Sequence, residues 1–192
     1  MILVLPAFLG VALGFLVGGR VERLALLRFR RIELFFAAFV VQIVAFPFPW
    51  LPWTTNGTLA TCLWLVSFAL VAAGAWCNRH IVGVPIVAAG LASNVLAVGM
   101  NGGHMPALPS ALAAANESYV VSNNSERVAA PHLSWLVDRW AVPDWLPVGN
   151  VYSLGDAVIA VGIVLVVVVA MGTGVPRLRQ AALIDDRRLT GQ

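Results

Sequence analysis

A long apolar stretch near the C-terminus, residues 154–173, reads LGDAVIAVGIVLVVVVAMGT. An α-helix rises 1.5 Å per residue, so a run of this length matches the ~30 Å hydrocarbon core of a bilayer. The only charged residue in the run, Asp156, stands close to its beginning. The stretch therefore predicts a membrane-spanning helix that ends in apolar residues and begins with an acid.

Four further segments have the same length and polarity. They cover approximately residues 1–18, 32–48, 58–76 and 81–100. Together, the five segments predict an all-α polytopic membrane helix bundle. It forms one integral membrane domain over residues 1–176, with an outer loop at 101–151 and a cytoplasmic tail at 177–192.

The composition excludes several other classes of protein. Hydrophobic residues make up 60% of the chain and charged residues 11%, and the mean hydropathy is +0.87. A soluble domain is closer to 45–50% apolar and ~25% charged. A soluble single domain, a disordered chain and a nucleic-acid binder are therefore excluded, although the pI is near 9.5.

The positions of the basic residues predict the orientation of the bundle. All twelve are arginines, and ten of them follow the first or fifth segment or lie between the third and fourth. By the positive-inside rule, this places the N-terminus outside and the C-terminus in the cytoplasm. Five of these arginines are also candidates for contacts with anionic lipid headgroups, although orientation alone explains them; they are Arg20, Arg23, Arg28, Arg30 and Arg31.

The predicted outer loop contains two candidate helices. Residues 110–116 are rich in alanine and predict a short helix. Between Leu133 and Trp140, apolar residues recur at positions 133, 136, 137 and 140, which lie on one helical face. This spacing predicts an amphipathic helix that lies on the outer membrane surface or covers the end of the bundle.

Asp156 is the main candidate for chemistry, because an acid at the edge of a membrane span is costly to bury. One interpretation makes it a catalytic carboxylate or an ion ligand at the outer rim. The other is structural, since Ser153 and Asp156 have the spacing of a capping box at a helix N-terminus. The helix dipole would also favour a carboxylate at this position.

Other polar residues near the predicted spans are candidates for a polar cluster. Asn94 and Asn101 are seven residues apart on one helical face, and Gln42 in the second span is predicted to meet Asn94 across the bundle. In Asn101-Gly-Gly-His-Met-Pro106, a glycine in the left-handed conformation and the proline predict the end of a helix. That explanation leaves His104 without a role, so it stays a candidate.

Metal and cofactor sites are not expected. Cys62 and Cys77 lie on one predicted helix, about 22 Å apart at 1.5 Å per residue, which is beyond the reach of a disulfide. The chain has no CxxC pair and no Cys/His cluster of the kind that binds zinc.

Several of these elements together resemble a family of bacterial membrane proteins catalogued as a domain of unknown function (number 5317). The resemblance spans nearly the whole chain and rests on Gly18-Gly19-Arg20, Gln42, Asn94, Asn101-Gly-Gly-His-Met-Pro106 and Tyr152-Ser-Leu-Gly-Asp156. The chain departs from the family at His104, where an aromatic residue is expected. The resemblance implies five spans in a bacterial plasma membrane and no assigned activity.

Three functions remain open from the sequence. The first is a non-catalytic accessory or assembly subunit, bound to partner membrane proteins or to further copies of itself. Small residues suited to close helix packing favour it, namely Gly10, Gly14, Gly18, Gly90 and Ala97. The second is an outer-leaflet lipid or lipoprotein hydrolase or transferase that uses Asp156. The third is a small-solute transporter, for which polar residues at the midplane are few.

Overall fold

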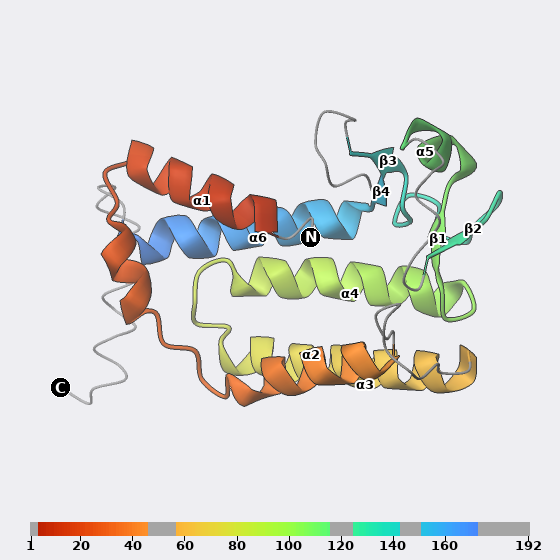
Figure 1. Ribbon diagram of the computed structural model, residues 1–192, viewed down its shortest axis with the longest axis horizontal. Coiled ribbons are helices and arrows are strands. Elements are labelled where there is room, and N and C mark those ends of the chain that lie inside the picture. The colour runs from red at the N-terminus through yellow and green to blue at the C-terminus, as the bar shows by residue number, and fades with distance from the viewer. Residues whose placement is uncertain (1–3, 46–56, 116–124, 143–150, 173–192) are drawn as a thin grey trace.

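The computed structural model describes residues 4–45, 57–115, 125–142 and 151–172. It is mostly helical with a few short strands (Figure 1). The all-α prediction is therefore confirmed, and five long helices occupy the predicted segments. They are α1 (Val4–Leu16), α2 (Glu33–Ala45), α3 (Gly57–Cys77), α4 (Val84–Met100) and α6 (Leu154–Ala170), with the short 3-10 helix η1 (Val21–Leu26) after α1.

Helix length separates α3 from the other long helices. Among the described residues, α3 is the helix long and apolar enough to cross a bilayer, with 21 residues. The helices α1, α2, α4 and α6 are equally apolar in character but have 13 to 17 residues. A full crossing takes about 20 helical residues. By length and composition alone, α3 is thus the one helix of the described residues that could span a membrane.

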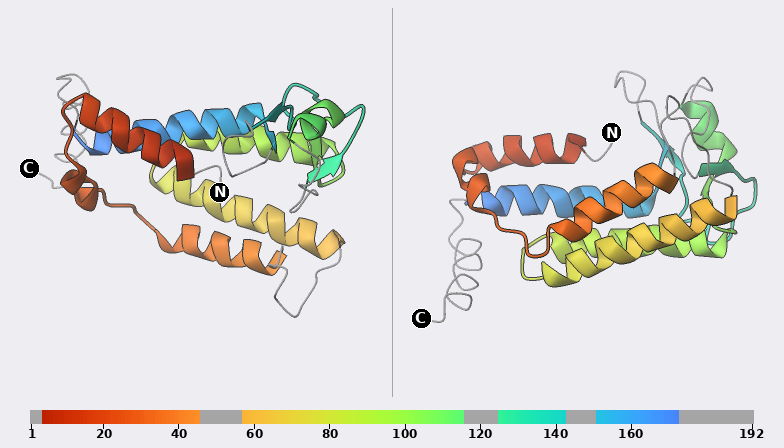
Figure 2. Two further views of the ribbon diagram at one scale, coloured as in Figure 1. Left: turned by 45° about the horizontal axis from the view of Figure 1, so that its top comes forward. Right: turned by 60° about the horizontal axis from the view of Figure 1, so that its bottom comes forward.

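The long helices pack in an order that differs from their order in the chain. Helix α6 packs against α1 on one side and α4 on the other, while α3 packs against both α4 and α2 (Figures 1 and 2). The first and last long helices are therefore neighbours. Helices α3 and α4 run antiparallel and are joined by turns at residues 78–83.

Glycines set the distance between α4 and α6. A Cβ atom on Gly90 would lie 2.5 Å from the carbonyl oxygen of Gly155 and 2.7 Å from Cγ1 of Ile159. Gly83 and Gly162 meet in the same way; Gly83 lies seven residues before Gly90, at the N-cap of α4, and Gly162 lies seven residues after Gly155. Because the two helices are antiparallel, both pairs lie face to face, and the backbones approach as closely as small residues allow.

Two glycines of α1 also allow this helix to pack closely on α6. Gly10 lies against Val167, and Gly14 lies against the side chain of Met171. The predicted packing roles of these two glycines and of Gly90 are thus confirmed. Gly18 differs, since a Cβ atom there would meet nothing within 4 Å; its φ of +78° places it in the left-handed turn after α1.

A small mixed region covers the end of the bundle where α4 ends and α6 begins. It contains α5 (Pro109–Ala114) and two pairs of short strands: β1 (Met105–Ala107) runs parallel to β2 (Ser125–Arg127), and β3 (Trp140–Ala141) runs antiparallel to β4 (Val151–Tyr152). Its apolar core consists of Ala107, Ala111, Ala115 and Val151. Helix α5 confirms the short helix predicted at residues 110–116.

The prediction of an amphipathic helix between Leu133 and Trp140 is wrong. Leu133 has a φ of +52°, and the following residues form turns that lead into β3. The backbone of Asp138 bonds β1 instead: its N–H donates to the carbonyl of Pro106 at 3.0 Å, and its carbonyl accepts from the N–H of Leu108 at 2.9 Å. The apolar residues at 136 and 137 are buried, but strand-like pairing with β1 buries them, not one face of a helix.

Candidate functional site

A cluster of three polar side chains joins α4 to the start of α6. Asn94 Nδ2 donates a hydrogen bond of 2.8 Å to Asp156 Oδ1. Ser153 Oγ lies 3.0 Å from Asn94 Oδ1 and 2.9 Å from Asp156 Oδ2. We call these three residues the Asn94 clasp. Ser153 is fully buried, and Asn94 and Asp156 are half-buried.

Local sequence explains why Asp156 occupies this position. Ser153 is the N-cap of α6, and its Oγ accepts a bond of 3.1 Å from the backbone N–H of Asp156. In return, Asp156 Oδ2 accepts a bond of 3.0 Å from the backbone N–H of Ser153. This reciprocal pair is the capping box predicted from the sequence, and it satisfies two of the amide groups that a helix N-terminus leaves unpaired.

The clasp depends on Gly155. A Cβ atom at this position would overlap Oδ1 of Asn94 and would lie 2.7 Å from the carbonyl oxygen of Gly90. Only a glycine therefore lets the amide of Asn94 reach both Ser153 and Asp156. Both carboxylate oxygens of Asp156 are engaged, one by Asn94 and one by Ser153, so the arrangement fixes the carboxylate in place.

Removing the clasp is expected to destabilise the junction between α4 and α6. Ser153→Ala should lower the free energy of unfolding by about 1 kcal/mol, the usual effect of losing an N-cap. Asp156→Ala should lower it by about 2 kcal/mol, because Asn94 Nδ2 and the amide of Ser153 both lose their acceptor. Denaturant titration of the purified chain in detergent micelles measures both effects.

The double variant Ser153→Ala/Asp156→Ala serves as the control for this interpretation. The two side chains bond each other, so the combined loss should fall short of the sum by at least about 0.5 kcal/mol. Strictly additive losses would contradict a shared clasp.

Asn101 does not join the clasp, contrary to the expected convergence with Asn94 and Asp156. It follows α4 directly, and its side chain binds the backbone of His132. Oδ1 accepts from the N–H of His132 at 2.8 Å, and Nδ2 donates to the His132 carbonyl at 2.9 Å. Nδ2 also bonds the carbonyl of Ala97 at 2.7 Å, four residues earlier.

The same arrangement recurs at the opposite end of the bundle, at a residue that the sequence does not single out. Asn78 follows α3 directly, and its Oδ1 accepts from the N–H of Arg30 at 2.7 Å. Its Nδ2 donates to the carbonyls of Arg30 and Gly74, at 2.8 and 2.7 Å. An asparagine immediately after a long apolar helix is the sequence signal that both sites share.

Each of these asparagines holds a residue that precedes a left-handed backbone. Arg31, after Arg30, has a φ of +53°, and Leu133, after His132, has a φ of +52°. Non-glycine residues rarely adopt this conformation. Because the asparagine fixes both polar groups of the preceding residue, it offsets the cost of the turn and ties a distant segment to the helix end.

Two further candidates lie apart from the clasp. Gln42 is predicted to meet Asn94, but this is wrong: its Nε2 donates to Ser67 Oγ on α3 at 3.3 Å, because α2 packs on α3 and not on α4. His104 is half-buried in the turn between α4 and β1. There, Gly102 and Gly103 have positive φ, which confirms the predicted end of the helix.

A comparison with protein families places the chain. The model of a family of unknown function, DUF5317, matches residues 26–168, about three quarters of the sequence. The chain belongs to this family. Its DUF5317 region runs from the end of η1 to the last turn of α6, so it contains the Asn94 clasp and both helix-end asparagines. No curated protein and no solved structure matches the chain.

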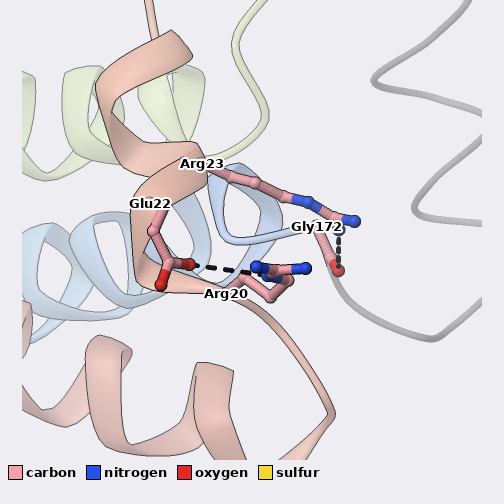
Figure 3. Close-up of polar contacts among 4 residues, drawn as sticks. All are labelled: Arg20, Glu22, Arg23 and Gly172. Atoms are coloured by element: carbon pink, nitrogen blue, oxygen red, sulfur yellow. Dashed lines mark hydrogen bonds and ion pairs between the residues drawn. The ribbon is translucent and has the colours of Figure 1, made fainter.

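The five arginines from Arg20 to Arg31, which we call the arginine run of this DUF5317 protein, differ in their partners. Arg20 pairs with Glu22 at 3.5 Å, and Arg23 Nη1 donates to the carbonyl of Gly172 at 2.9 Å, just past the end of α6 (Figure 3). A backbone hydrogen bond at Glu22, with a contribution from Arg20, holds the pKa of this exposed carboxyl below its usual range. Arg28, Arg30 and Arg31 are all exposed, and Arg30 and Arg31 also lie beside the end of α3.

The described part of the DUF5317 chain contains no group of three or more His, Cys, Asp or Glu side chains placed to hold a metal ion. Cys62 and Cys77 are both free thiols, as their separation predicts.

Proposed function

We propose that this protein is a multi-pass protein of the bacterial plasma membrane, with its N-terminus outside, and that it acts as a non-catalytic accessory or assembly subunit of a larger membrane complex. The observation that carries this proposal is that both carboxylate oxygens of Asp156 are hydrogen-bonded within the Asn94 clasp. The carboxylate that the sequence offers for chemistry is bonded through both oxygens to groups that hold two helices together.

Exposed apolar side chains support a membrane environment. On α1, the exposed residues include Phe8 and Leu16, and on α2 they include Phe36, Phe39 and Val40. Helices that are apolar on all sides are typical of membrane spans, whereas water-facing helices carry a polar stripe. Lipid tails or partner helices would cover these side chains.

The two ends of the bundle differ in charge in the way that the proposed orientation requires. Arg23 bonds the end of α6, and Arg30 bonds the end of α3, so the arginine run gathers at one end. The opposite end carries Arg127 in β2 and Arg139 next to β3. An excess of arginine at one end supports a cytoplasmic location for that end.

A packing role also fits the way the helices meet. The glycine pairs between α4 and α6 and the asparagines after α3 and α4 all serve to fix one segment against another. Helices α1 and α2 lie at the two ends of the packing order. The outer surfaces of these two helices are the natural places for partner subunits within the membrane.

Purification of the tagged chain from native membranes in mild detergent tests the proposal. We expect a stoichiometric complex of defined mass in native mass spectrometry, and the same complex with Asp156→Asn. A chain that elutes as a monomer without a partner would contradict the proposal. If Asp156→Asn abolished the cellular phenotype while stability and the complex were unchanged, the outer-leaflet enzyme would replace it.

A further inference from the structure

A basic hollow lies where α2 begins and α3 ends. It is an open hollow at the surface, with a volume of about 480 Å³. The side chains that line it are Arg30, Arg31, Trp76, Cys77 and Arg79. Residues from two separate chain segments, three of them arginines, therefore border one space, beside an aromatic ring.

The charge of the basic hollow is only partly neutralised. Glu33 lies 3.5 Å from Arg31 Nη1 and compensates one arginine. Arg79 Nη1 donates to the carbonyl of Trp76 at 2.9 Å, which leaves further N–H groups of that guanidinium for a ligand. Within the described residues, the guanidinium of Arg30 has no hydrogen bond or ion pair. The hollow thus carries positive charge that an anion would satisfy.

The backbone around the basic hollow is held rigidly. Asn78 is fully buried and bonds both polar groups of the Arg30 peptide. Arg31 is kept in the left-handed conformation, at a φ of +53°. Strained backbone that the surroundings hold in place is concentrated at ligand clamps and other functional sites. The arginines are therefore presented from a preorganised turn, which reduces the entropy lost when a ligand binds.

The aromatic wall indicates which kind of anion fits. Trp76 is 68% exposed, and the guanidinium of Arg79 lies 4.4 Å from its ring centroid. Arginine binds phosphate groups through paired N–H donors. Tryptophan is enriched where lipid headgroups meet hydrocarbon, because its ring is amphipathic. A free phosphate ion would use the arginines but would gain nothing from the ring.

We propose that the basic hollow binds the phosphate headgroup of an anionic phospholipid, with Arg30 and Arg79 on the phosphate and Trp76 against the glycerol region. The inference rests on the membrane location in the proposed function, but it does not require a partner subunit. It assigns a ligand to Arg79 and to one member of the arginine run, Arg30, and separates them from Arg20 and Arg23, whose partners lie within the protein.

Native mass spectrometry of the full chain in neutral detergent tests this site, with dioctanoyl-phosphatidylglycerol as the probe. We expect saturable binding of one lipid and at least tenfold weaker binding of dioctanoyl-phosphatidylcholine, which is zwitterionic. Arg30→Gln should weaken phosphatidylglycerol binding about tenfold, because a charge-assisted bond to phosphate is lost. The fold should survive, since that guanidinium makes no bond within the described residues.

Arg28→Gln is the matched control, because it removes the same charge from an equally exposed position in the same run that does not line the hollow. Its effect on the Kd should stay below threefold. Equal effects of Arg28→Gln and Arg30→Gln would overturn the site and indicate diffuse attraction by the whole run. Inorganic phosphate that binds as tightly as phosphatidylglycerol would overturn the lipid assignment. Because this titration needs no partner subunit, its outcome is separate from the co-purification test.

Discussion

Gly90→Ala should lower the free energy of unfolding by about 2–3 kcal/mol, the upper part of the range for overpacking a close contact. The added Cβ atom would meet the carbonyl oxygen of Gly155 at 2.5 Å and the amide nitrogen of Ile159 at 2.9 Å. Both are backbone atoms of α6, so no side-chain rotation can relieve the contact. The helices must separate, and the Asn94 clasp beside them must lengthen. Titration with a denaturing detergent measures the loss.

Gly99→Ala is the matched control, since Gly99 lies on the same helix and a Cβ atom there would meet nothing within 4 Å. Alanine is a better helix former than glycine, so this variant should be unchanged or stabilised by up to about 1 kcal/mol. Opposite signs for the two substitutions would establish that contact with α6, and not helix propensity, decides the result. Equal losses would show that the glycine pair does not set the packing.

Asn78→Asp replaces the side-chain amide after α3 by a carboxylate. It should lower the free energy of unfolding by about 3–5 kcal/mol, as for a buried charge left without a partner. The amide nitrogen of Asn78 donates to the carbonyls of Arg30 and Gly74. A carboxylate would place negative charge against both carbonyl oxygens in a fully buried position. The turn that carries Arg30 and Arg31 should detach from α3.

The pH dependence of this variant has a definite sign. Burial raises the pKa of a carboxyl introduced at position 78 above its value in the unfolded chain. The destabilisation is therefore complete above that raised pKa, and it decreases as the pH falls toward the pKa of the unfolded chain. Below that pKa, the carboxyl is protonated in both states. Unfolding titrations of the variant and the parent chain at pH 4.5 and pH 8 measure this difference.

Asn101→Asp provides the comparison, because Asn101 makes the same three bonds, to His132 and to the carbonyl four residues earlier. Asn101 is half-exposed, whereas Asn78 is fully buried. Water can solvate the new carboxylate at position 101, so the loss there should be about 1–2 kcal/mol. A loss as large as that of Asn78→Asp would mean that hydrogen-bond geometry, and not burial, sets the cost.

Local chemistry made part of the candidate site predictable. The spacing of Ser153 and Asp156 is that of a capping box, and the structure has that box, because an N-cap depends only on residues within one helical turn. Gly102 and Gly103 end α4 for a similarly local reason. The partner of Gln42 was not predictable, since periodicity assigns it to a helix but does not indicate which helix lies opposite.

The segment after Pro131 shows where helical periodicity misleads. Apolar residues at 133, 136, 137 and 140 have helical spacing, yet Leu136 and Val137 are buried beside β1. The hydrogen bonds of Asp138 to the segment around Pro106 decide this, and they join residues that are 30 and 32 positions apart. The backbone N–H and carbonyl of Asp138 find their partners in a distant segment, and no local sequence pattern indicates which segment that is.

By itself, the sequence determined where the five long apolar helices lie, the glycines that end α4, and the cap that holds Asp156. Only the tertiary structure decided which helices meet, and therefore that Asn94 binds Asp156, that Asn101 binds His132, and that Arg30 and Arg79 line one hollow. The physical reason is one of range. Helix formation and capping depend on neighbours within about four residues, whereas packing depends on close approach between segments, which glycines such as Gly90 and Gly155 permit only where two surfaces fit.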